Sequence, residues 1–222
     1  MKKINQLLFP LFMLTALLFS NCSVLCSKST GAIISKEINL NLFNSLTNNT
    51  LADITIKEGL VQKITITGNE DVINEIMFLE SNNTLEIDLE KEIVFCNKNK
   101  IKIDIVIPNI VSLKSSGNSN INLVNFSQIE NLTIISSGNG DVSFNNVSVK
   151  NCNLSLSGNG NFNGFSGDII NCTVKISGNG DCEANVKSNL DASISGNGTV
   201  YFKGNPIVKS NVSGNGELVN AN

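Results

Sequence analysis

The chain of 222 residues contains no histidine, no arginine and no tryptophan, so lysine supplies all 16 of its basic side chains. Without histidine there is no imidazole to act as a general base near neutral pH, to complete a Ser/His/Asp triad or to bind zinc. The formal net charge is -3 and aromatic residues make up only 5% of the chain. Nucleic acids require a basic surface and stacking rings. We therefore expect neither an enzyme nor a nucleic-acid-binding protein, and no cofactor or metal centre.

What the chain does contain is apolar material and asparagine. Hydrophobic residues make up 41% of the sequence and charged residues 16%, which is enough to build one ordinary domain. Asparagine occurs 37 times, or about once in six residues. A chain with this composition is expected to fold, and to carry an unusually amide-rich surface.

The first segment is typical of an export signal. Residues 1–21 place Lys2 and Lys3 before a short apolar run, which is too short to serve as a membrane anchor. Ser20, Asn21 and Cys22 then resemble a bacterial lipobox, in which a lipid is attached to the cysteine sulfur. Lipidation at Cys22 and simple cleavage near Ser27 remain alternatives. Both predict export to the cell envelope, as an outer-membrane lipoprotein, at the cell surface or in the periplasm, with residues 22–34 as a short linker.

The second half of the chain, residues 111–218, is a repeat. A Ser-Gly-Asn string recurs six times, and successive copies lie 21, 20, 20, 18 and 18 residues apart. Its glycines are Gly117, Gly138, Gly158, Gly178, Gly196 and Gly214. Apolar residues alternate with polar ones before and after each glycine, which indicates strands with one inward face. Repeats this short bury their apolar residues only by stacking on their neighbours.

These features predict an all-β fold, a parallel β-solenoid (β-helix) with about 18–21 residues per coil, preceded by a strand-rich N-terminal half of the same domain. The inward positions four residues before the glycines are Leu113, Ile134, Leu154, Val174, Ala192 and Ser210. The inward positions six residues before the glycines are Val111, Leu132, Cys152, Cys172, Leu190 and Val208. Val212 stands at an inward position two residues before a glycine. Those four after are Ile121, Val142, Phe162, Cys182, Val200 and Leu218.

The Gly-Asn-Gly string is interpreted as the corner between two strands. We expect glycine and asparagine there because both tolerate positive φ. Stacking places one asparagine of each copy in a column, where the amides are positioned to form a hydrogen-bonded ladder. The column consists of Asn118, Asn139, Asn159, Asn179, Asn197 and Asn215.

The first half lacks this corner but alternates as strands do. The predicted strands are 38–42, 52–56, 64–66, 85–89 and 101–107, with a single helical turn within 72–77. Together with the repeats, the strings ITGNEDVINEI from Ile66, NNTLEIDLE from Asn82 and IKIDIVIPNI from Ile101 resemble the head GIN domain family over residues 35–218. The family comprises bacterial envelope proteins classed as autotransporter adhesins.

The resemblance implies a β-helix-like domain exported to the surface or periplasm, with adhesion as the role proposed for the family. Autotransporters export themselves through a membrane barrel built of many strands. No such strands follow Asn222 in this sequence, so we expect a lipid on Cys22 or another protein to hold the domain at the surface.

Two further sets of residues have alternative interpretations. Cys152 and Cys172 occupy equivalent positions on adjacent coils, so they are either small core residues, like Cys182, or partners in a disulfide. Acids at the corner suggest calcium, but the equivalent positions alternate with neutral residues, which disfavours it. Those positions are Asn120, Asp141, Asn161, Asp181, Thr199 and Glu217.

Two functions are consistent with these observations. The first is an adhesin or surface-binding module without catalytic activity, whose partner is a surface glycan or a host matrix protein. The scarcity of aromatic rings counts against a glycan partner, because sugar-binding sites usually stack the sugar on an amphipathic ring and Tyr201 is the one such ring on the repeats. The alternative is a structural spacer or assembly module of the envelope that self-associates through the ends of the solenoid. Either protein would meet a membrane only through a lipid on Cys22, which is one of the two alternatives for that residue.

Overall fold

The computed structural model describes residues 29–90 and 101–222, and nearly all of its regular structure is strand. The first part contains β1 (Ile33–Ile38), β2 (Ser45–Asn48), β3 (Asp53–Glu58), β4 (Lys63–Asn69), α1 (Glu70–Ile73), β5 (Ile76–Ser81), β6 (Thr84–Leu89) and β7 (Lys102–Ile107). The repeats contain β8 (Ser112–Ser115), β9 (Ile121–Val124), β10 (Ile129–Ser136), β11 (Val142–Asn145), β12 (Val147–Leu156), β13 (Phe162–Ile176), β14 (Cys182–Ile194), β15 (Val200–Lys203), β16 (Ile207–Val212) and β17 (Leu218–Asn220). The predicted signal and Cys22 lie outside the described residues.

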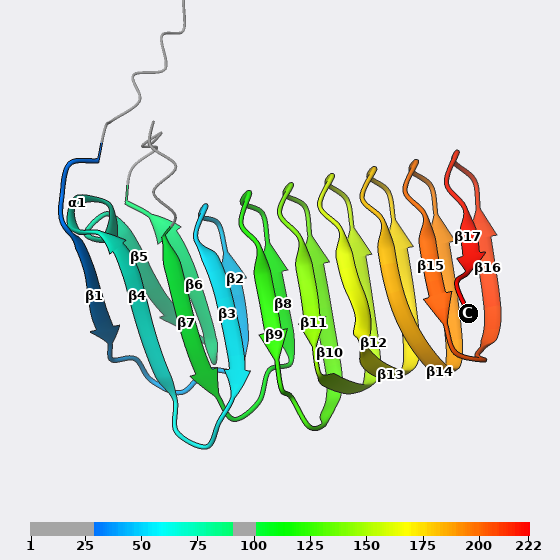
Figure 1. Ribbon diagram of the computed structural model, residues 1–222, viewed down its shortest axis with the longest axis horizontal. Coiled ribbons are helices and arrows are strands. Elements are labelled where there is room, and N and C mark those ends of the chain that lie inside the picture. Colours follow the sequence, from blue (N-terminus) through cyan, green and yellow to red (C-terminus); the bar gives the residue numbers. More distant parts are fainter. Residues whose placement is uncertain (1–28, 91–100) are drawn as a thin grey trace, which may run out of the picture.

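The strands form two facing sheets of one solenoid (Figure 1). Face A contains, in spatial order, β5, β6, β2, β8, β10, β12, the second parts of β13 and β14, and β16. Face B contains β1, β4, β7, β3, β9, β11, the first parts of β13 and β14, then β15 and β17. The Ser-Gly-Asn turns lead from face A to face B along what we call the corner edge. The chain comes back from face B to face A along the return edge.

The repeat register confirms the predicted parallel β-solenoid. Leu132 lies beside Cys152, and Cys152 beside Cys172, in consecutive parallel pairs. Cys172 in turn lies beside Leu190, one shorter coil further on. Positions that the sequence aligns on the corner glycines are therefore neighbours in space.

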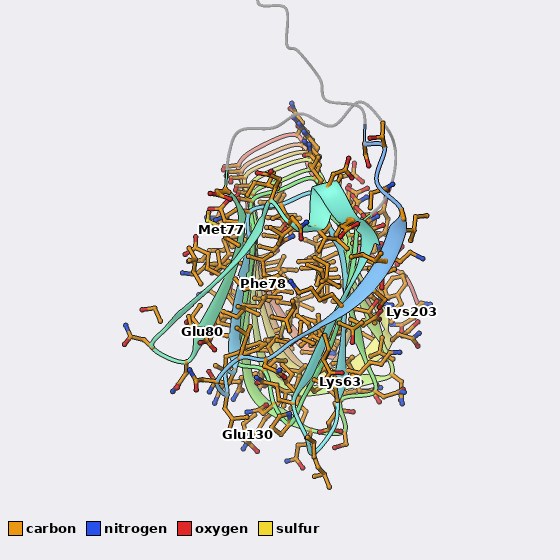
Figure 2. All side chains as sticks on the ribbon, turned by 90° about the vertical axis from the view of Figure 1, so that its left-hand side faces the viewer. Lys63, Met77, Phe78, Glu80, Glu130 and Lys203 are labelled. Carbon is orange, nitrogen blue, oxygen red and sulfur yellow. The ribbon has the colours of Figure 1, made fainter. Side chains whose placement is uncertain are left out.

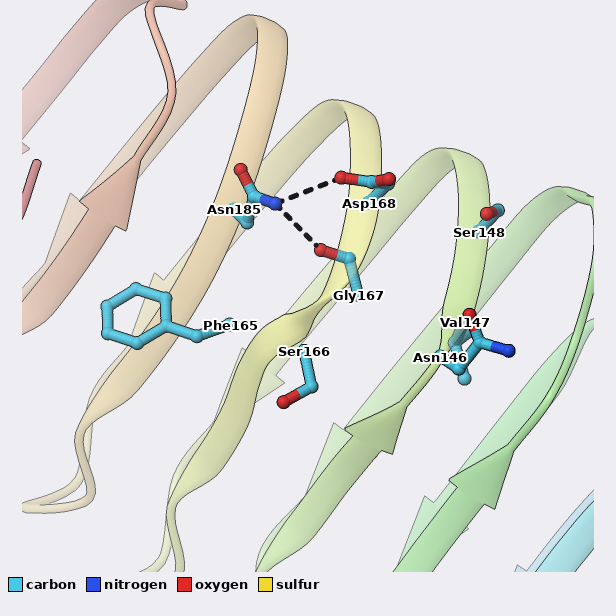
Figure 3. Close-up of a pocket in the computed structure, with 8 residues that line it drawn as sticks. All are labelled: Asn146, Val147, Ser148, Phe165, Ser166, Gly167, Asp168 and Asn185. Carbon is cyan, nitrogen blue, oxygen red and sulfur yellow. Dashed lines mark hydrogen bonds between the residues drawn. The ribbon is translucent and has the colours of Figure 1, made fainter.

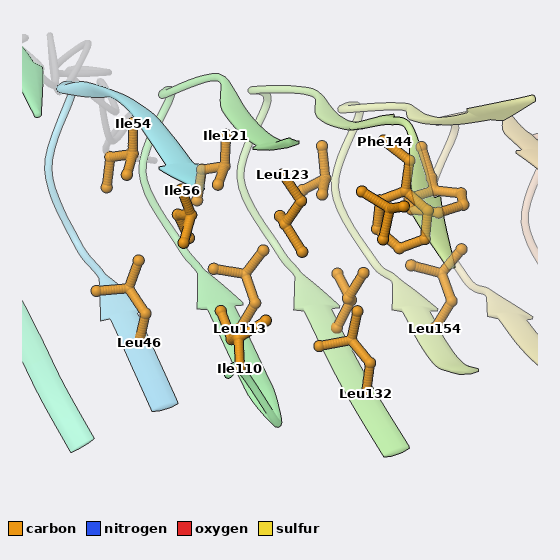
Figure 4. Packing of buried hydrophobic residues seen from close by; sticks show 14 of the residues in the cluster. Leu46, Ile54, Ile56, Ile110, Leu113, Ile121, Leu123, Leu132, Phe144 and Leu154 are labelled. Atoms are coloured by element: carbon orange, nitrogen blue, oxygen red, sulfur yellow. The ribbon is translucent and has the colours of Figure 1, made fainter. Parts of the chain in front are cut away.

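The interior between the faces is filled by these columns of apolar side chains, seen end-on in Figure 2 and from close by in Figure 4. Leu113 and Leu154 are buried on face A, and Ile121 on face B. The rings of Phe144 and Phe162 meet edge to face, with centroids 4.8 Å apart and planes at 82°. Each coil thus buries its apolar residues against the coils on both sides, as repeats of this length must.

The first half does not continue the stack in sequence order. β2 pairs in parallel with β6 on one side and with β8 on the other, while β3 pairs with β7 and β9. Residues 45–58 therefore form a coil that lies between β6 and β7 and the first repeat (Figure 1). Leu46 and Ile54 of this inserted coil are almost fully buried (Figure 4).

Four of the five strands predicted in the first half overlap β3, β4, β6 and β7. The prediction of a strand at 38–42 is wrong, because β1 ends at Ile38. The following segment is held instead by the Gln62 amide, which donates to the carbonyls of Leu40 and Asn41. The helical turn predicted within 72–77 begins slightly earlier, as α1.

The two ends of the solenoid differ. At the N-terminal end, seen in Figure 2, β1, β4 and β5 run antiparallel to their neighbours, and α1 buries Val72 and Ile73 against the core. At the other end all residues of β16 are exposed. The prediction that Val208, Ser210 and Val212 are enclosed in the core is wrong, because within the described residues no coil packs beyond β16.

Candidate functional site

The corner edge carries a continuous ladder of side-chain amides. Each corner asparagine donates from Nδ2 to Oδ1 of the asparagine one coil earlier. The distances are 2.6 Å from Asn139 to Asn118, 2.7 Å from Asn159 to Asn139, 2.8 Å from Asn179 to Asn159, 2.6 Å from Asn197 to Asn179 and 3.1 Å from Asn215 to Asn197. All six side chains are exposed. A carboxamide has two N–H groups and two lone pairs, so every inner rung keeps one of each for a ligand.

The corner glycines are required for a reason other than the one predicted from sequence. In the described chain, Gly204 is the one glycine with positive φ, so none of the corner glycines adopts the left-handed conformation. A Cβ at Gly138 would lie 1.8 Å from the carbonyl oxygen of Gly117, and one at Gly158 would lie 1.9 Å from that of Gly138. Glycine is therefore needed because the stacked backbones approach too closely for any side chain.

Positive φ belongs to the return edge instead. Asn125 and Asn146 have φ of 57° and 56°, and Asn146 donates to Oδ1 of Asn125 at 3.0 Å. Gly204 takes the equivalent place in a later coil, with φ of 92°. The left-handed conformation thus explains why asparagine and glycine recur at this second bend.

The column considered for calcium has a structural role. The backbone N–H of Asn161 donates to the carboxylate of Asp141 at 2.7 Å, and that of Thr199 donates to Asp181 at 2.7 Å. Asn120 and Asn161 accept in the same way from the coils that follow them. Among the described residues no cluster of three or more acidic or cysteine side chains is arranged to hold a metal ion. These oxygens serve as hydrogen-bond acceptors between coils.

A second amide ladder escaped the sequence interpretation. It lies at the start of face A, where Asn151 donates to Asn131 at 3.0 Å, Asn171 to Asn151 at 3.0 Å and Asn189 to Asn171 at 2.7 Å. The signal was present, because all four asparagines stand seven residues before a corner glycine. The next coil has Ile207 at this position, so the ladder ends there.

The return edge is hollowed where the coils bend (Figure 3). One hollow of about 190 Å³ is lined by Asn146, Val147, Ser148, Phe165, Ser166, Gly167, Asp168 and Asn185. Asn185 donates to Asp168 Oδ1 at 2.9 Å and to the Gly167 carbonyl at 3.0 Å. The Lys203 ammonium lies 4.3 Å from the centroid of the half-buried Phe165 ring. A carboxylate, amide groups and an aromatic ring therefore line this hollow, and an ammonium lies over the ring.

A larger hollow of about 500 Å³ adjoins the first and shares Ser148 and Asp168 with it. Its walls carry two exposed ion pairs between neighbouring coils, Lys150 with Glu130 at 2.9 Å and Lys187 with Asp168 at 2.8 Å. The hydrogen bond and charge of Lys150 lower the pKa of Glu130. Ile170 adds an apolar patch that is 44% exposed. We call the two hollows together the return-edge site.

Tyr201, the ring singled out in the sequence, is half-buried on face B beside Glu183 and does not line the return-edge site. Phe165 was missed because phenylalanine in a repeat is usually a core residue. The position seven residues after a corner glycine points outward, and this register is the signal that identifies Phe165 as a surface ring.

The three cysteines considered as core residues lie in the interior. Cys152, Cys172 and Cys182 are buried free thiols. The Cys172 hydrogen bond and burial raise the pKa of Cys152, and burial raises that of Cys182. Thiols held neutral in this way act as small apolar residues rather than nucleophiles.

A stack of short parallel coils with polar ladders along its edges defines the molecule as a parallel β-solenoid. The chain belongs to the family described as "Putative auto-transporter adhesin, head GIN domain", whose model matches residues 42–221. The resemblance stated from the sequence is thereby confirmed. No curated protein matches the chain.

Solved structures share the fold. A "putative adhesin" from Bacteroides fragilis NCTC 9343 is 21% identical, with a TM-score of 0.73, and the match covers 87% of this chain and 99% of that one. A "putative adhesin" from Parabacteroides merdae ATCC 43184 is 19% identical with a TM-score of 0.54, and a "putative lipid binding protein" from Parabacteroides distasonis ATCC 8503 is 17% identical with a TM-score of 0.54. Each of these two matches also covers 87% of this chain and 99% of the other. Within residues 29–90 and 101–222, no helix is both long and apolar enough to span a bilayer.

Proposed function

We propose that the protein is an exported surface-binding module that holds a polymeric partner, a surface glycan or a host matrix protein, without catalysing a reaction. The observation that carries this proposal is the return-edge site, where Asp168, Asn185 and the half-buried Phe165 line one hollow and the Lys203 ammonium lies over the Phe165 ring. Rings with convergent hydrogen-bonding groups suit ligands that have an apolar face and a polar rim. The family description as adhesin supports the same function.

Repetition adds to this site. The exposed amides of the corner ladder recur once per coil, at a spacing of about 4.8 Å. A polymer lying along the corner edge would meet one unused N–H at each inner rung. Several weak contacts on one chain combine into useful avidity, which is how a solenoid without a deep pocket can hold a long ligand.

Binding without catalysis agrees with the pKa shifts of two carboxyl groups. The pKa of Glu130 is lowered by Lys150, and that of Asp71 is lowered chiefly by the hydrogen bond from the backbone N–H of Thr30. A general acid of a glycan-cleaving enzyme needs the opposite shift, because it must stay protonated near neutral pH. Neither carboxyl is suited to that role.

The test is binding of the purified protein to immobilised glycans and matrix proteins, followed by biolayer interferometry. We expect Phe165→Ala and Asp168→Asn each to weaken binding of the partner about tenfold, since each removes one group worth about 1.4 kcal/mol. Asn145→Ala is the matched control, because Asn145 is exposed at the equivalent place one coil earlier and lines neither hollow. Absence of any bound glycan or matrix protein, or equal binding by all variants, would contradict the proposal.

Export and anchoring are part of the same proposal, and rest on residues outside the described part of the chain. Intact cells treated with external protease should lose the natural protein, and mass spectrometry should find a lipid on Cys22. Cys22→Ala should abolish the lipid and the surface exposure together. A protein protected from protease in intact cells would favour the alternative role of a periplasmic spacer, to which the open end of the solenoid lends support.

A further inference from the structure

The C-terminal end of the solenoid exposes apolar side chains in a regular strand. β16 pairs with β14 on one side, and no strand of the described chain lies on its other side. Ile207 is 78%, Val208 40% and Val212 43% exposed. Val208 and Val212 continue the buried columns of Leu190 and Ile194, to which they are directly paired. The surface is thus a cross-section of the core, with an unpaired strand edge along it.

The opposite end offers a surface of a different kind, in which the edge strands β1 and β5 expose Ile33 and Leu79. There α1 covers the core with Val72 and Ile73, which are 2% and 4% exposed, and the neighbouring strands run antiparallel. Stacking this end on the C-terminal end of another copy would therefore place a core covered by α1 against an open one, with edge strands of a different arrangement beside it. The surface that complements an open cross-section of this core is another open cross-section.

Two C-terminal ends meet well only in one register. In an antiparallel pair, residues directly opposite each other point to the same face of the sheet. A two-fold axis through Ser210 places Val208 opposite Val212 of the second copy, and Lys209 opposite Asn211 of the second copy. Shifting the axis to Lys209 sets two ammonium groups against each other, which is unfavourable. Shifting it to Asn211 separates the two valines.

We propose that this protein forms a closed, two-fold symmetric dimer in which β16 pairs antiparallel with β16 of a second copy, centred on Ser210. The same axis brings β17, the last strand of face B, beside its counterpart. Both open cores become continuous across the interface, and both capped ends point outward, so growth stops at two copies. The dimer carries two return-edge sites on one rod, but its formation is independent of any ligand for them.

The first test is sedimentation of the purified full chain over a range of concentrations. We expect the mass to double with rising concentration and then to remain constant. Val212→Lys should remain a monomer, because it places a charge in the apolar contact. Its melting temperature at low concentration should match that of the natural chain, because Val212 is not enclosed in the monomer. A natural chain that stays monomeric throughout, or that grows into longer assemblies, would overturn the proposal.

The second test fixes the register. In Ser210→Cys the two introduced cysteines lie directly opposite each other, about 4.5–5.5 Å apart at Cβ, and a shift of about 1 Å brings them to the distance that a disulfide requires. A mild oxidant should cross-link this variant into a covalent dimer, removing two electrons and two protons from the two thiols. Asn211→Cys is the matched control, since Asn211 faces Lys209 of the second copy and should cross-link far less. The natural chain, treated with the same oxidant, measures how much covalent dimer its own cysteines form.

Equal cross-linking of the two cysteine variants would exclude the Ser210-centred register and overturn the proposal. So would a monomer whose C-terminal end instead binds phosphatidylcholine vesicles, with loss of binding in Val212→Lys, because the apolar end would then be assigned to lipid. Neither result depends on the glycan or matrix ligand. Failure of the dimer and failure of the proposed binding function can therefore be told apart.

Discussion

At the scale of single residues, asparagine acts here as donor and acceptor at once. Each inner rung of the corner ladder donates from Nδ2 to the coil before it and accepts at Oδ1 from the coil after it. A carboxylate accepts but does not donate, so it satisfies only half of this pattern. The ladder is therefore sensitive to a change of a single atom, from nitrogen to oxygen.

Asn159→Asp is expected to destabilise the protein by about 1–2 kcal/mol at pH 7. The variant keeps the bond from Asn179 but places a carboxylate oxygen against Oδ1 of Asn139, to which the amide now donates at 2.7 Å. Lowering the pH through the carboxyl pKa should restore part of the loss, since a protonated acid donates again. Thermal unfolding at pH 7 and pH 4 measures both effects.

Asn118→Asp is the matched control. Asn118 lies at the first rung, accepts from Asn139 at 2.6 Å, and has Leu51 rather than an asparagine at the equivalent place in the preceding coil. A carboxylate there keeps the acceptor role, so the loss should be much smaller. Equal losses in the two variants would mean that the direction of the ladder is irrelevant to stability.

The buried thiols predict a loss of stability at alkaline pH. The folded state raises the pKa of Cys152 and Cys182, so the folded protein retains protons that the unfolded chain releases. Their stabilising contribution is complete below about pH 8.5, the ordinary thiol value, and is lost as the pH rises from there toward the folded pKa. The slope is at most about 1.4 kcal/mol per thiol per pH unit.

Urea unfolding at pH 7.5 and pH 10 measures this loss. Cys182→Val is the control, because Val142 and Val200 occupy the equivalent buried positions in other coils. The variant should lose less stability than the natural chain between the two pH values. An identical loss would attribute the alkaline effect to lysine or tyrosine ionisation instead.

At the scale of elements, the corner is determined by how closely consecutive coils approach. Alternation of apolar residues was enough to predict most strands, because one buried face imposes a period of two. It was not enough to explain the corner glycines, which avoid a clash with a carbonyl oxygen in the coil before. A contact between residues about 20 positions apart is invisible to a rule about local φ.

Gly138→Ala is expected to cost about 3 kcal/mol or more, because its Cβ would lie 1.8 Å from the backbone oxygen of Gly117 and the stack would have to open. Gly68→Ala is the control. Gly68 is also buried in a strand, but its Cβ would meet its nearest atom at 3.6 Å. Chemical denaturation of both variants should separate them clearly, and similar stabilities would show that the coils can yield at the corner.

At the scale of the whole molecule, the inserted coil joins the two halves into one body. β2 and β3 pair with β8 and β9 of the first repeat on one side and with β6 and β7 on the other. In a stack of coils each level is stabilised by its neighbours, so a defect at this junction weakens both. The repeats are consequently not expected to be independent of residues 45–58.

Leu46→Ala should cost about 2–5 kcal/mol, because Leu46 is 1% exposed between β6 and β8. Amide hydrogen exchange should accelerate in β6 and β8 as well as in β2. Leu51→Ala, at an exposed position in the same coil, should change stability by less than about 0.5 kcal/mol. Faster exchange confined to β2 would show that the two halves are energetically separate.

The sequence by itself determined the solenoid, its period, its inward columns and the family, because each is written in residues that recur at a fixed spacing. The tertiary structure alone decided where residues 45–58 insert, why β1 stops at Ile38, which end of the stack is open and that Phe165 borders a hollow. These features depend on contacts between segments far apart in the chain. The repeat period and the apolar pattern describe what successive coils have in common. The open end, the inserted coil and the return-edge site lie at positions where neighbouring coils differ in sequence or pairing.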